Sequence, residues 1–381
     1  MRIAIFTDTF FPDVNGVATT LANYITYLDQ SEHEYHIFKP STDHDQPLYT
    51  HPLLSMRFFL YPEYQIHLPN YAQIKQSLKA FKPDIIHVVT PFSIGLYGIR
   101  YALKNQIPLV GSYHTNFDQY LNYYHLRFLS QALWKYLHRV HEPMERIFVP
   151  STDTLQQLKR KGFTNLRLWQ RGVDTNTFRP SAHNKTFRKN YNITTPFTLS
   201  YVGRLSPEKN IDALMQIINS LQYSFSNKIH WLIVGDGPER QRLMELNNPN
   251  ITFTGYLHGQ DLTDIYANSD LFVFPSATET FGNVVLESLA SGTPVIGSNT
   301  GGVKYLLENQ PHAHGITCDP NKPDQFVKAI TDLLTNPLKR HQMGNSARIF
   351  AKSKSWQKIF DQLLDDYTDV LQDRDDQTKQ A

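Results

Sequence analysis

Cysteine is almost absent from this chain of 381 residues, which contains one, Cys318. A single thiol excludes a disulfide framework within the chain and fits a reducing compartment. Long apolar runs are absent too, since none approaches the roughly 20 residues that a helix needs to span a bilayer. The first residues, MRIAIFTDTF, lack the charged, apolar and cleavage regions of a secretory signal peptide. We therefore expect a cytoplasmic protein, with peripheral contact at the inner face of the cell membrane left open.

Excess charge is also missing: the net charge is +2 with histidine neutral, from 37 Lys and Arg against 35 Asp and Glu. A balance this close to zero excludes the global basic field of a nucleic-acid-binding protein, so we expect no nucleic-acid partner. The G-x-x-x-x-G-K-[ST] pattern of a P-loop is absent as well.

Short apolar runs alternate with helical patterns along most of the chain. The runs include residues 3–6, 85–89, 197–202 and 271–274, and residues 34–38 are a further expected strand. This alternation predicts an α/β fold with doubly wound parallel sheets. The length indicates about two domains, and the strand pattern restarts at residue 197 after a polar, irregular stretch. We therefore expect a first domain over residues 1–180 and a second over residues 190–352.

The most informative stretch is residues 271–303, LFVFPSATETFGNVVLESLASGTPVIGSNTGGV. Its pattern predicts a buried strand, a loop and a helix with Asn283 as N-cap, followed by another strand. The N–H groups at a helix start point outward and favour phosphate or sugar oxygens, which makes Phe281, Gly282, Asn283 and Val284 candidate binding residues.

Two carboxylates stand eight positions apart in this stretch, Glu279 in the loop and Glu287 in the helix. Carboxylates accept hydrogen bonds from vicinal hydroxyls, so the pair can hold two sugar rings of one ligand. The alternative is a solvated loop glutamate and a glutamate that complements the helix dipole. Taken singly, each glutamate fits this alternative better.

Further candidates lie where predicted strands end. Arg204 and Lys209, in GRLSPEKN, can grip a diphosphate, by a bidentate fork and by a point charge. His114 can donate to a sugar hydroxyl, and the N–H of Gly16 can approach a phosphate at a helix entrance. The alternatives are solvated cations, a structural histidine and a conformational glycine. We expect His87, within an apolar run, to be a core residue.

Taken together, these segments resemble the family 4 glycosyltransferases. ETFGNVVLESLASGTPVIG matches the E-x7-E signature of that family, and GRLSPEKN matches its G-R-x-x-x-E-K-N/G motif. SYHTN resembles the segment whose histidine contacts the donor sugar, and RGVDTNTFRP resembles the segment at the domain junction. The resemblance implies the GT-B fold, with two Rossmann-like doubly wound parallel-sheet domains facing a cleft. It also implies that a helix over residues 356–371 packs back on the first domain, and we expect residues 372–381 to be frayed.

The resemblance implies a retaining glycosyltransferase that moves a hexose from a nucleotide-diphosphate sugar, UDP-glucose or GDP-mannose, to an acceptor hydroxyl. The first domain would bind the acceptor and the second the donor. Arg204 and Lys209, with the Gly16 amide, would stabilise the leaving diphosphate, and the amides of 281–284 would contact the sugar. No D-x-D-type acidic pair is placed here to bind a metal, so we expect metal-independent chemistry and no cofactor.

The same resemblance implies roles for the other candidates. Glu287 would bind the ribose, Glu279 the transferred sugar, and His114 would help to position that sugar. Tyr256 and Leu257 would pack against the nucleotide base.

TDTFFPDVNGV and TPFSIG look most like relatives that modify lipids, so a membrane glycolipid, or a lipid such as diacylglycerol, is a candidate acceptor. Residues 122–146 form a basic amphipathic pattern, with Tyr123, Tyr124 and Trp134 as candidate interface residues on an anionic membrane. The alternative is a helix packed on its own domain.

Two other functions remain open at this point. One is a GT-B nucleotide-sugar epimerase or hydrolase that needs no acceptor. The other is a non-catalytic nucleotide-sugar-binding module, against which the presence of every charged candidate and of His114 argues.

Overall fold

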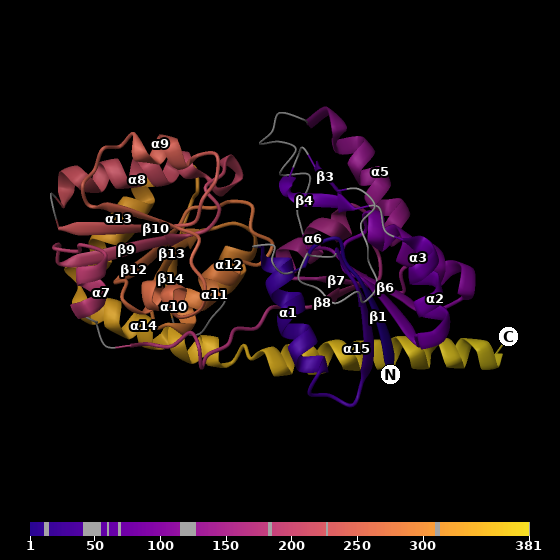
Figure 1. Cartoon of the computed structure of the whole chain (residues 1–381). Helices are drawn as coiled ribbons and strands as arrows, with labels where there is room; N and C mark the ends of the chain where they lie inside the picture. The colour runs from indigo at the N-terminus through magenta and orange to yellow at the C-terminus, as the bar shows by residue number, and fades with distance from the viewer. Residues whose placement is uncertain are drawn as a thin grey trace. The chain divides into compact units, whose positions relative to one another are not determined.

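The computed structural model describes residues 1–10, 15–40, 55–58, 61–67, 70–114, 127–181, 185–225, 228–308 and 313–380. The chain divides into two compact units, Met1–Gln170 with Trp356–Ala381, and Arg171–Ser355 (Figure 1). We expected the first domain to end at residue 180. The division lies between Gln170 and Arg171 instead, because the segment from Arg171 onward packs on the second unit. There the Val173 N–H donates to the Lys354 carbonyl at 2.9 Å.

A six-stranded parallel sheet forms the centre of the first unit, in the order β2-β1-β5-β6-β7-β8. Its register pairs Ile5 with His87 and His87 with Val110, so neighbouring strands end together at the carboxyl edge. The strands are β1 (Arg2–Phe6), β2 (Glu34–Phe38), β5 (Ile85–Val88), β6 (Leu109–Ser112), β7 (Arg146–Val149) and β8 (Leu166–Leu168). An antiparallel hairpin, β3 (Ser55–Phe58) with β4 (Tyr61–His67), was not predicted from the apolar pattern.

The inner strands β1, β5, β6 and β7 are mostly buried on both faces of the sheet, which explains why they read as largely apolar runs. Ile3 and Ile5 belong to one core cluster, with residues of α1 and α15, while Ala4 and Phe6 belong to another, with residues of α2, α3 and α5. The helices are α1 (Gly16–Leu28), α2 (Tyr71–Phe81), α3 (Ser93–Asn105), η1 (Arg127–Leu129, a 3-10 turn), α5 (Ser130–His141), α6 (Thr152–Arg160) and α15 (Trp356–Gln380).

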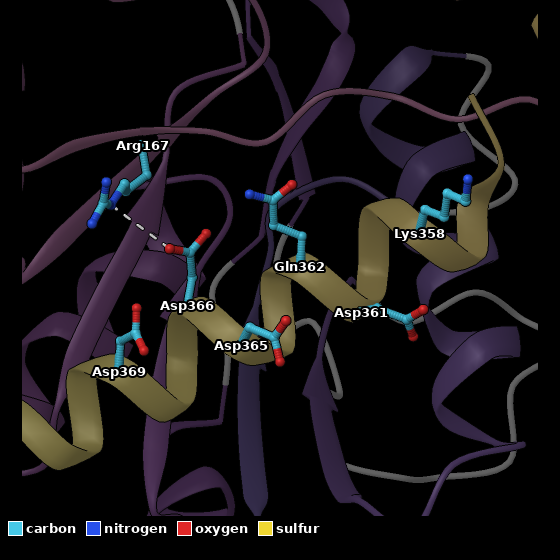
Figure 2. A pocket seen from close by; sticks show the side chains of 7 residues that line it. All are labelled: Arg167, Lys358, Asp361, Gln362, Asp365, Asp366 and Asp369. Atoms are coloured by element: carbon cyan, nitrogen blue, oxygen red, sulfur yellow. Dashed lines mark ion pairs between the residues drawn. The ribbon is translucent and has the colours of Figure 1, made fainter. Parts of the chain in front are cut away.

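The C-terminal helix α15 is longer than the sequence indicated. Our expectation that residues 372–381 are frayed is wrong as far as residue 380, where the helix ends. Two ion pairs within its C-terminal half join it to the start of β7 and the residue before it. Arg146 pairs with Asp373 and Arg374 pairs with Glu145, each at 3.2 Å. Figure 2 shows the outer polar face of the same helix, where Arg167 from β8 points toward Asp366 at 3.7 Å.

His87 is a core residue, as expected. It is fully buried, its Nδ1 lies 2.5 Å from the Tyr367 hydroxyl of α15, and its Nε2 lies 2.6 Å from Ser112 Oγ. Both ring nitrogens therefore have partners, and the histidine ties α15 to the carboxyl end of β6.

The predicted amphipathic segment at 122–146 contains a shorter helix, α5, and residues 115–126, which include Tyr123 and Tyr124, lie outside the described residues. Trp134 is buried with its ring 6.1 Å from that of Phe163, so its assignment as an interface residue is wrong. Among the described helices, none is long and apolar enough to cross a membrane.

The second unit holds another six-stranded parallel sheet, in the order β11-β10-β9-β12-β13-β14. Its strands are β9 (Phe197–Val202), β10 (Ile229–Val234), β11 (Ile251–Gly255), β12 (Leu271–Phe274), β13 (Val295–Ser298) and β14 (Gly315–Cys318). Its helices are α7 (Lys185–Asn190), η2 (Pro207–Lys209, a 3-10 turn), α8 (Ile211–Ser224), α9 (Arg240–Met244), α10 (Gly259–Ala267), α11 (Asn283–Ala290), α12 (Gly301–Leu307), α13 (Pro323–Thr335) and α14 (Pro337–Lys352).

Strand order reverses once in each sheet, between β1 and β5 and between β9 and β12. Loops diverge from the carboxyl ends of the strands at such a switch point, and open α/β sheets bind their ligands there. The segments after β9 and β12 contain GRLSPEKN and SATETFG, so the fold places the two strongest motifs side by side.

The His87 network predicts a stability effect. Tyr367→Phe should lower the free energy of unfolding by about 1–3 kcal/mol, because Nδ1 of His87 would lose its partner inside the core. Chemical denaturation measures this, with Tyr223→Phe, at an 89% exposed position, as the control. Equal stability of the two variants would contradict the assigned role of the Tyr367 hydroxyl.

Candidate active site

The loops after β9 and β12 meet through an ion pair. Nζ of Lys209, at the end of η2, contacts Oε1 of Glu279, and Ser276 Oγ donates to the same oxygen at 3.0 Å. The Lys209 and Glu279 side chains are 16% and 15% exposed, so the pair is largely shielded from water. A cation and a carboxylate that are 70 residues apart in the sequence are thus in contact at the carboxyl edge of the sheet.

Arg204 is held by a carboxylate that we did not select from the sequence, Glu208. The Glu208 side chain is fully buried, its Oε1 lies 3.8 Å from Arg204 Nη1, and Ser206 Oγ donates to it at 2.5 Å. Thr278 Oγ1, from the β12 loop, donates to the Glu208 carbonyl at 3.0 Å. Glu208 could have been selected from the motif itself, because it is an acidic residue next to Lys209 and four positions after Arg204.

Asn210, the last residue of the motif, fixes where the β9 loop turns into α8. Its backbone is left-handed, with φ of 57°, which asparagine tolerates better than most residues. Its side-chain amide donates to the Pro275 carbonyl at 3.2 Å and to the Pro320 carbonyl at 2.8 Å. One residue therefore joins the segments that follow β9, β12 and β14.

The start of α11 depends on glycine. The helix begins at Asn283 and its N-cap is Gly282, with φ of 93°, so our assignment of Asn283 as N-cap is wrong by one residue. A left-handed N-cap suits glycine because it has no Cβ. Residues 281–284, whose amides are the candidate donors, include the last residues before α11 and its first two residues. The Phe281 side chain is buried.

The first residues of α12 pack against the backbone of the Glu279 loop. The Gly302 N–H donates to the Glu279 carbonyl at 2.8 Å. A Cβ at Gly301 would lie 2.3 Å from the Glu279 carbonyl oxygen, and one at Gly302 would lie 2.2 Å from Phe281 Cα. Only glycine permits so close an approach of the two backbones.

Glu287 lies within α11, and its Oε2 accepts a hydrogen bond from the Tyr266 hydroxyl at 2.9 Å. Burial raises the pKa of the Glu287 carboxyl to about 7, and the bond from Tyr266 acts in the opposite direction. A carboxylate with this pKa changes its charge near neutral pH. Sequence spacing did not reveal Tyr266, because it belongs to α10.

The two candidates for the nucleotide base lie after β11. Tyr256 is 40% exposed, and its hydroxyl donates to the Asp236 carbonyl at 3.1 Å. Leu257 is partly buried against the core of the second unit.

Gly16 and His114 belong to the first unit. Gly16 is the first residue of α1, whose N-cap, Asn15, accepts hydrogen bonds from Val17 N and Ala18 N at 3.0 and 2.9 Å. His114 follows β6, with its ring centroid 5.4 Å from that of Trp169.

A second carboxylate that sequence analysis passed over, Asp8, lies at the switch point of the first sheet. It is 4% exposed and accepts from Ser93 Oγ and Ile94 N, both at 2.8 Å, at the start of α3. Burial raises the pKa of the Asp8 carboxyl, while these bonds lower it.

Comparison with known proteins identifies the family. The model for "Glycosyltransferase Family 4" matches residues 14–177, and the model for "Glycosyl transferases group 1" matches residues 183–350. A GDP-mannose-dependent alpha-mannosyltransferase of Mycobacterium tuberculosis is 30% identical over 379 residues, which cover 97% of each chain. The chain belongs to the family 4 glycosyltransferases.

A further relative agrees with this family assignment, and a solved structure has the same fold. An alpha-monoglucosyldiacylglycerol synthase of Streptococcus pneumoniae is 31% identical over 331 residues, covering 81% of this chain and 74% of that protein. The Anabaena protein HepE, crystallised in complex with UDP-glucose, superposes with a TM-score of 0.74 at 18% identity, covering 97% of this chain and 100% of HepE. The two parallel sheets confirm the expected GT-B fold.

Two glycines offer a matched test of the Glu279 loop. Gly301 and Gly259 each begin a helix with a left-handed backbone, φ of 54° and 55°. A methyl group at Gly301 would strike the Glu279 carbonyl, whereas no described atom lies within 4 Å of one at Gly259. Gly301→Ala should lower kcat/KM about 100-fold through displacement of Glu279. Gly259→Ala should show only backbone strain, about 1 kcal/mol of stability.

Steady-state kinetics and thermal unfolding of both variants measure these effects. Equal losses of activity in the two would mean that backbone strain, rather than displacement of Glu279, is responsible.

Proposed function

We propose that this glycosyltransferase moves a hexose from a nucleotide-diphosphate sugar, UDP-glucose or GDP-mannose, to a hydroxyl of a sugar or lipid acceptor such as diacylglycerol. The observation that carries the proposal is the contact between Lys209 and Glu279, which puts a cation for a diphosphate beside a carboxylate for a sugar. The donor class is supported by the mannosyltransferase relative, named as GDP-mannose-dependent, and by HepE with UDP-glucose. The synthase relative supports a lipid acceptor.

Arg204 and Lys209 would stabilise the departing diphosphate, helped by the Gly16 amide. The Arg204 side chain is 12% exposed and lies 3.8 Å from the Glu208 carboxylate, so it is largely shielded from water before charge develops. Fixed cations aimed at a developing charge in a dry site are the most effective kind of electrostatic catalysis. The Lys209 ammonium has three N–H donors, so it can hold Glu279 and a phosphate oxygen together.

Glu279 would accept hydrogen bonds from the transferred hexose, with the amides of residues 281–284 beside it, and Glu287 would accept from the ribose hydroxyls. His114 would position the sugar, with the Trp169 ring restricting its orientation. Tyr256 and Leu257 would contact the base, and the first unit would bind the acceptor.

The reaction would retain the anomeric configuration. The acceptor oxygen forms its bond to the anomeric carbon on the face that the nucleotide leaves, the bond from that carbon to the phosphate oxygen breaks, and the leaving phosphate takes the acceptor's proton. We propose that Arg204 and Lys209 make a metal unnecessary, because they supply the positive charge that the leaving group needs.

The direct test is product analysis with UDP-glucose or GDP-mannose and a diacylglycerol acceptor. Lys209→Ala should lower kcat about 100- to 1000-fold, the range found when one fixed donor to a developing charge is removed. Arg242→Ala is the matched control, since Arg242 is a half-exposed cation of the same unit that pairs with Asp212 and Glu239. EDTA should leave the native rate unchanged.

Three results would contradict this proposal. Donor hydrolysis or epimerisation without transfer would favour the epimerase or hydrolase, inverted product configuration would overturn the retaining mechanism, and an unaffected Lys209→Ala variant would remove the assigned cation.

We also propose peripheral contact between α5 and the inner face of the cell membrane. Lys135 and Arg139 are exposed one turn apart on α5, and Phe128, just before it, is 76% exposed. A basic face beside an exposed aromatic side chain favours anionic lipid surfaces.

Vesicle co-sedimentation measures this contact. Lys135→Glu with Arg139→Glu should weaken binding to vesicles that contain anionic lipid about tenfold or more, since each basic residue near such a surface contributes about 1 kcal/mol. The control is Lys328→Glu with Lys339→Glu in the second unit. Equal binding by both double variants would exclude α5 as the membrane contact.

A further inference from the structure

Residues 174–180, near the start of the second unit, are hydrogen-bonded to the same side chain as α11, the helix that carries Glu287. One guanidinium, that of Arg348 on α14, makes the connection. Its Nη1 donates to the Phe178 carbonyl at 2.7 Å and to the Ala290 carbonyl, at the end of α11, at 2.6 Å, and its Nη2 donates to the Thr175 carbonyl at 2.8 Å. The Arg348 guanidinium therefore links residues 174–180 to α11 by hydrogen bonds.

The same segment also reaches Glu287 through side chains. The Phe178 ring packs edge-to-face on the ring of Tyr266, with centroids 5.9 Å apart and an interplanar angle of 69°. Tyr266 also packs edge-to-face with Phe272 of β12, with centroids 5.5 Å apart and an interplanar angle of 70°. Edge-to-face pairs fix ring orientation, so the Tyr266 hydroxyl can point in one direction, toward Glu287.

Backbone contacts fix both partners of the Tyr266–Glu287 hydrogen bond. Thr293 Oγ1 donates to the Tyr266 carbonyl at 2.6 Å, and Ser291 Oγ donates to the Glu287 carbonyl at 3.0 Å. The Tyr266 ring is fully buried, and burial holds the pKa of its hydroxyl well above the ordinary value. Tyr266 therefore remains a hydrogen-bond donor throughout the neutral pH range.

We infer that Tyr266, held in place by Phe178 of the segment that opens the second unit, is a positioning residue for Glu287 and thereby sets the affinity for the nucleotide-sugar donor. This inference rests on the proposed role of Glu287 as the acceptor of the ribose hydroxyls. It gives residues 174–180 a part in donor recognition as well as in the connection between the two units.

The hydrogen bond also controls the charge of Glu287. Burial raises the pKa of the carboxyl to about 7, and the Tyr266 bond restrains that rise. The ionised form accepts hydroxyl bonds more strongly, so donor affinity falls as the pH drops through about 7. Loss of the bond raises the pKa further and moves this fall to higher pH.

The helices packed against α11 carry further acidic or basic side chains, namely Asp261 and Asp264 on α10, Lys304 on α12, and Lys339, Arg340, His341, Arg348 and Lys352 on α14. Arg348 on α14 bonds the backbone carbonyls described above, and Lys304 on α12 pairs with Glu308 at 3.8 Å. Among the described residues, Tyr266 on α10 is the titratable group that bonds the Glu287 carboxyl.

Tyr266→Phe tests the inference because it removes the hydroxyl and keeps the ring. With UDP-glucose or GDP-mannose, whichever is turned over, KM for the donor should rise about tenfold at pH 7 while kcat stays nearly unchanged. The midpoint of the dependence of KM on pH should move to higher pH. The matched control is Tyr27→Phe, which removes a tyrosine–carboxylate bond to Asp361 in the first unit, and its KM should equal that of the native enzyme.

A double-mutant cycle separates positioning from a general loss of structure. In a Glu287→Gln background, Tyr266→Phe should add little to the donor KM, because Tyr266 acts through the carboxylate. Phe178→Leu keeps the apolar contact and loses the edge-to-face geometry, so it should shift KM and the pH midpoint in the same direction by a smaller factor. It also serves as the test if Tyr266→Phe fails to fold.

The possible failures are distinguishable. If Glu287→Gln leaves the donor KM unchanged, the proposed role of Glu287 is wrong. If Glu287→Gln raises KM while Tyr266→Phe and Phe178→Leu leave KM and the pH midpoint unchanged, the role of Glu287 stands and the inference about Tyr266 is overturned.

Discussion

The buried carboxylate of Glu208 is the constraint on which the candidate active site depends. A charge removed from water is tolerated only when it is paired and hydrogen-bonded, and here Arg204 and Ser206 provide those partners. The Glu208 carboxylate therefore attracts the guanidinium of Arg204, 3.8 Å away. Because Thr278 bonds the Glu208 carbonyl, the loop that carries Glu279 is fixed by the same residue.

The first unit also has a buried carboxylate with hydrogen-bond partners at its switch point, that of Asp8. In both units a carboxylate is buried where the strand order reverses, and it holds together loops that would otherwise diverge. Asp8 does so by accepting bonds at the start of α3, and Glu208 does so by pairing with a cation. The bonds of Asp8 stay within the scaffold, whereas Glu208 pairs with Arg204, whose proposed role is to bind the donor diphosphate.

Glycine and tyrosine support the proposed donor-binding residues by opposite means. Gly301 and Gly302 work by lacking a side chain, which lets two backbones approach closely and places the Glu279 carbonyl. Tyr266 works by filling space, because its ring packs edge-to-face with both Phe178 and Phe272 while its hydroxyl donates to Glu287. The two glutamates, eight positions apart in the sequence, thus have separate supports, and a change at one need not disturb the other.

The sequence was sufficient for the α/β class, which follows from local apolar periodicity, and for the motifs, which are short strings such as GRLSPEKN. The GT-B fold followed from the resemblance of these strings to a known family. The sequence also identified His87 as a core residue, since an apolar strand offers few other environments. It could not identify Glu208, Tyr266 or Asp8, nor the burial of Trp134 and the full length of α15. Those features depend on contacts between residues far apart in the chain, which local spacing does not encode; only tertiary packing removes a group from water and supplies its partner.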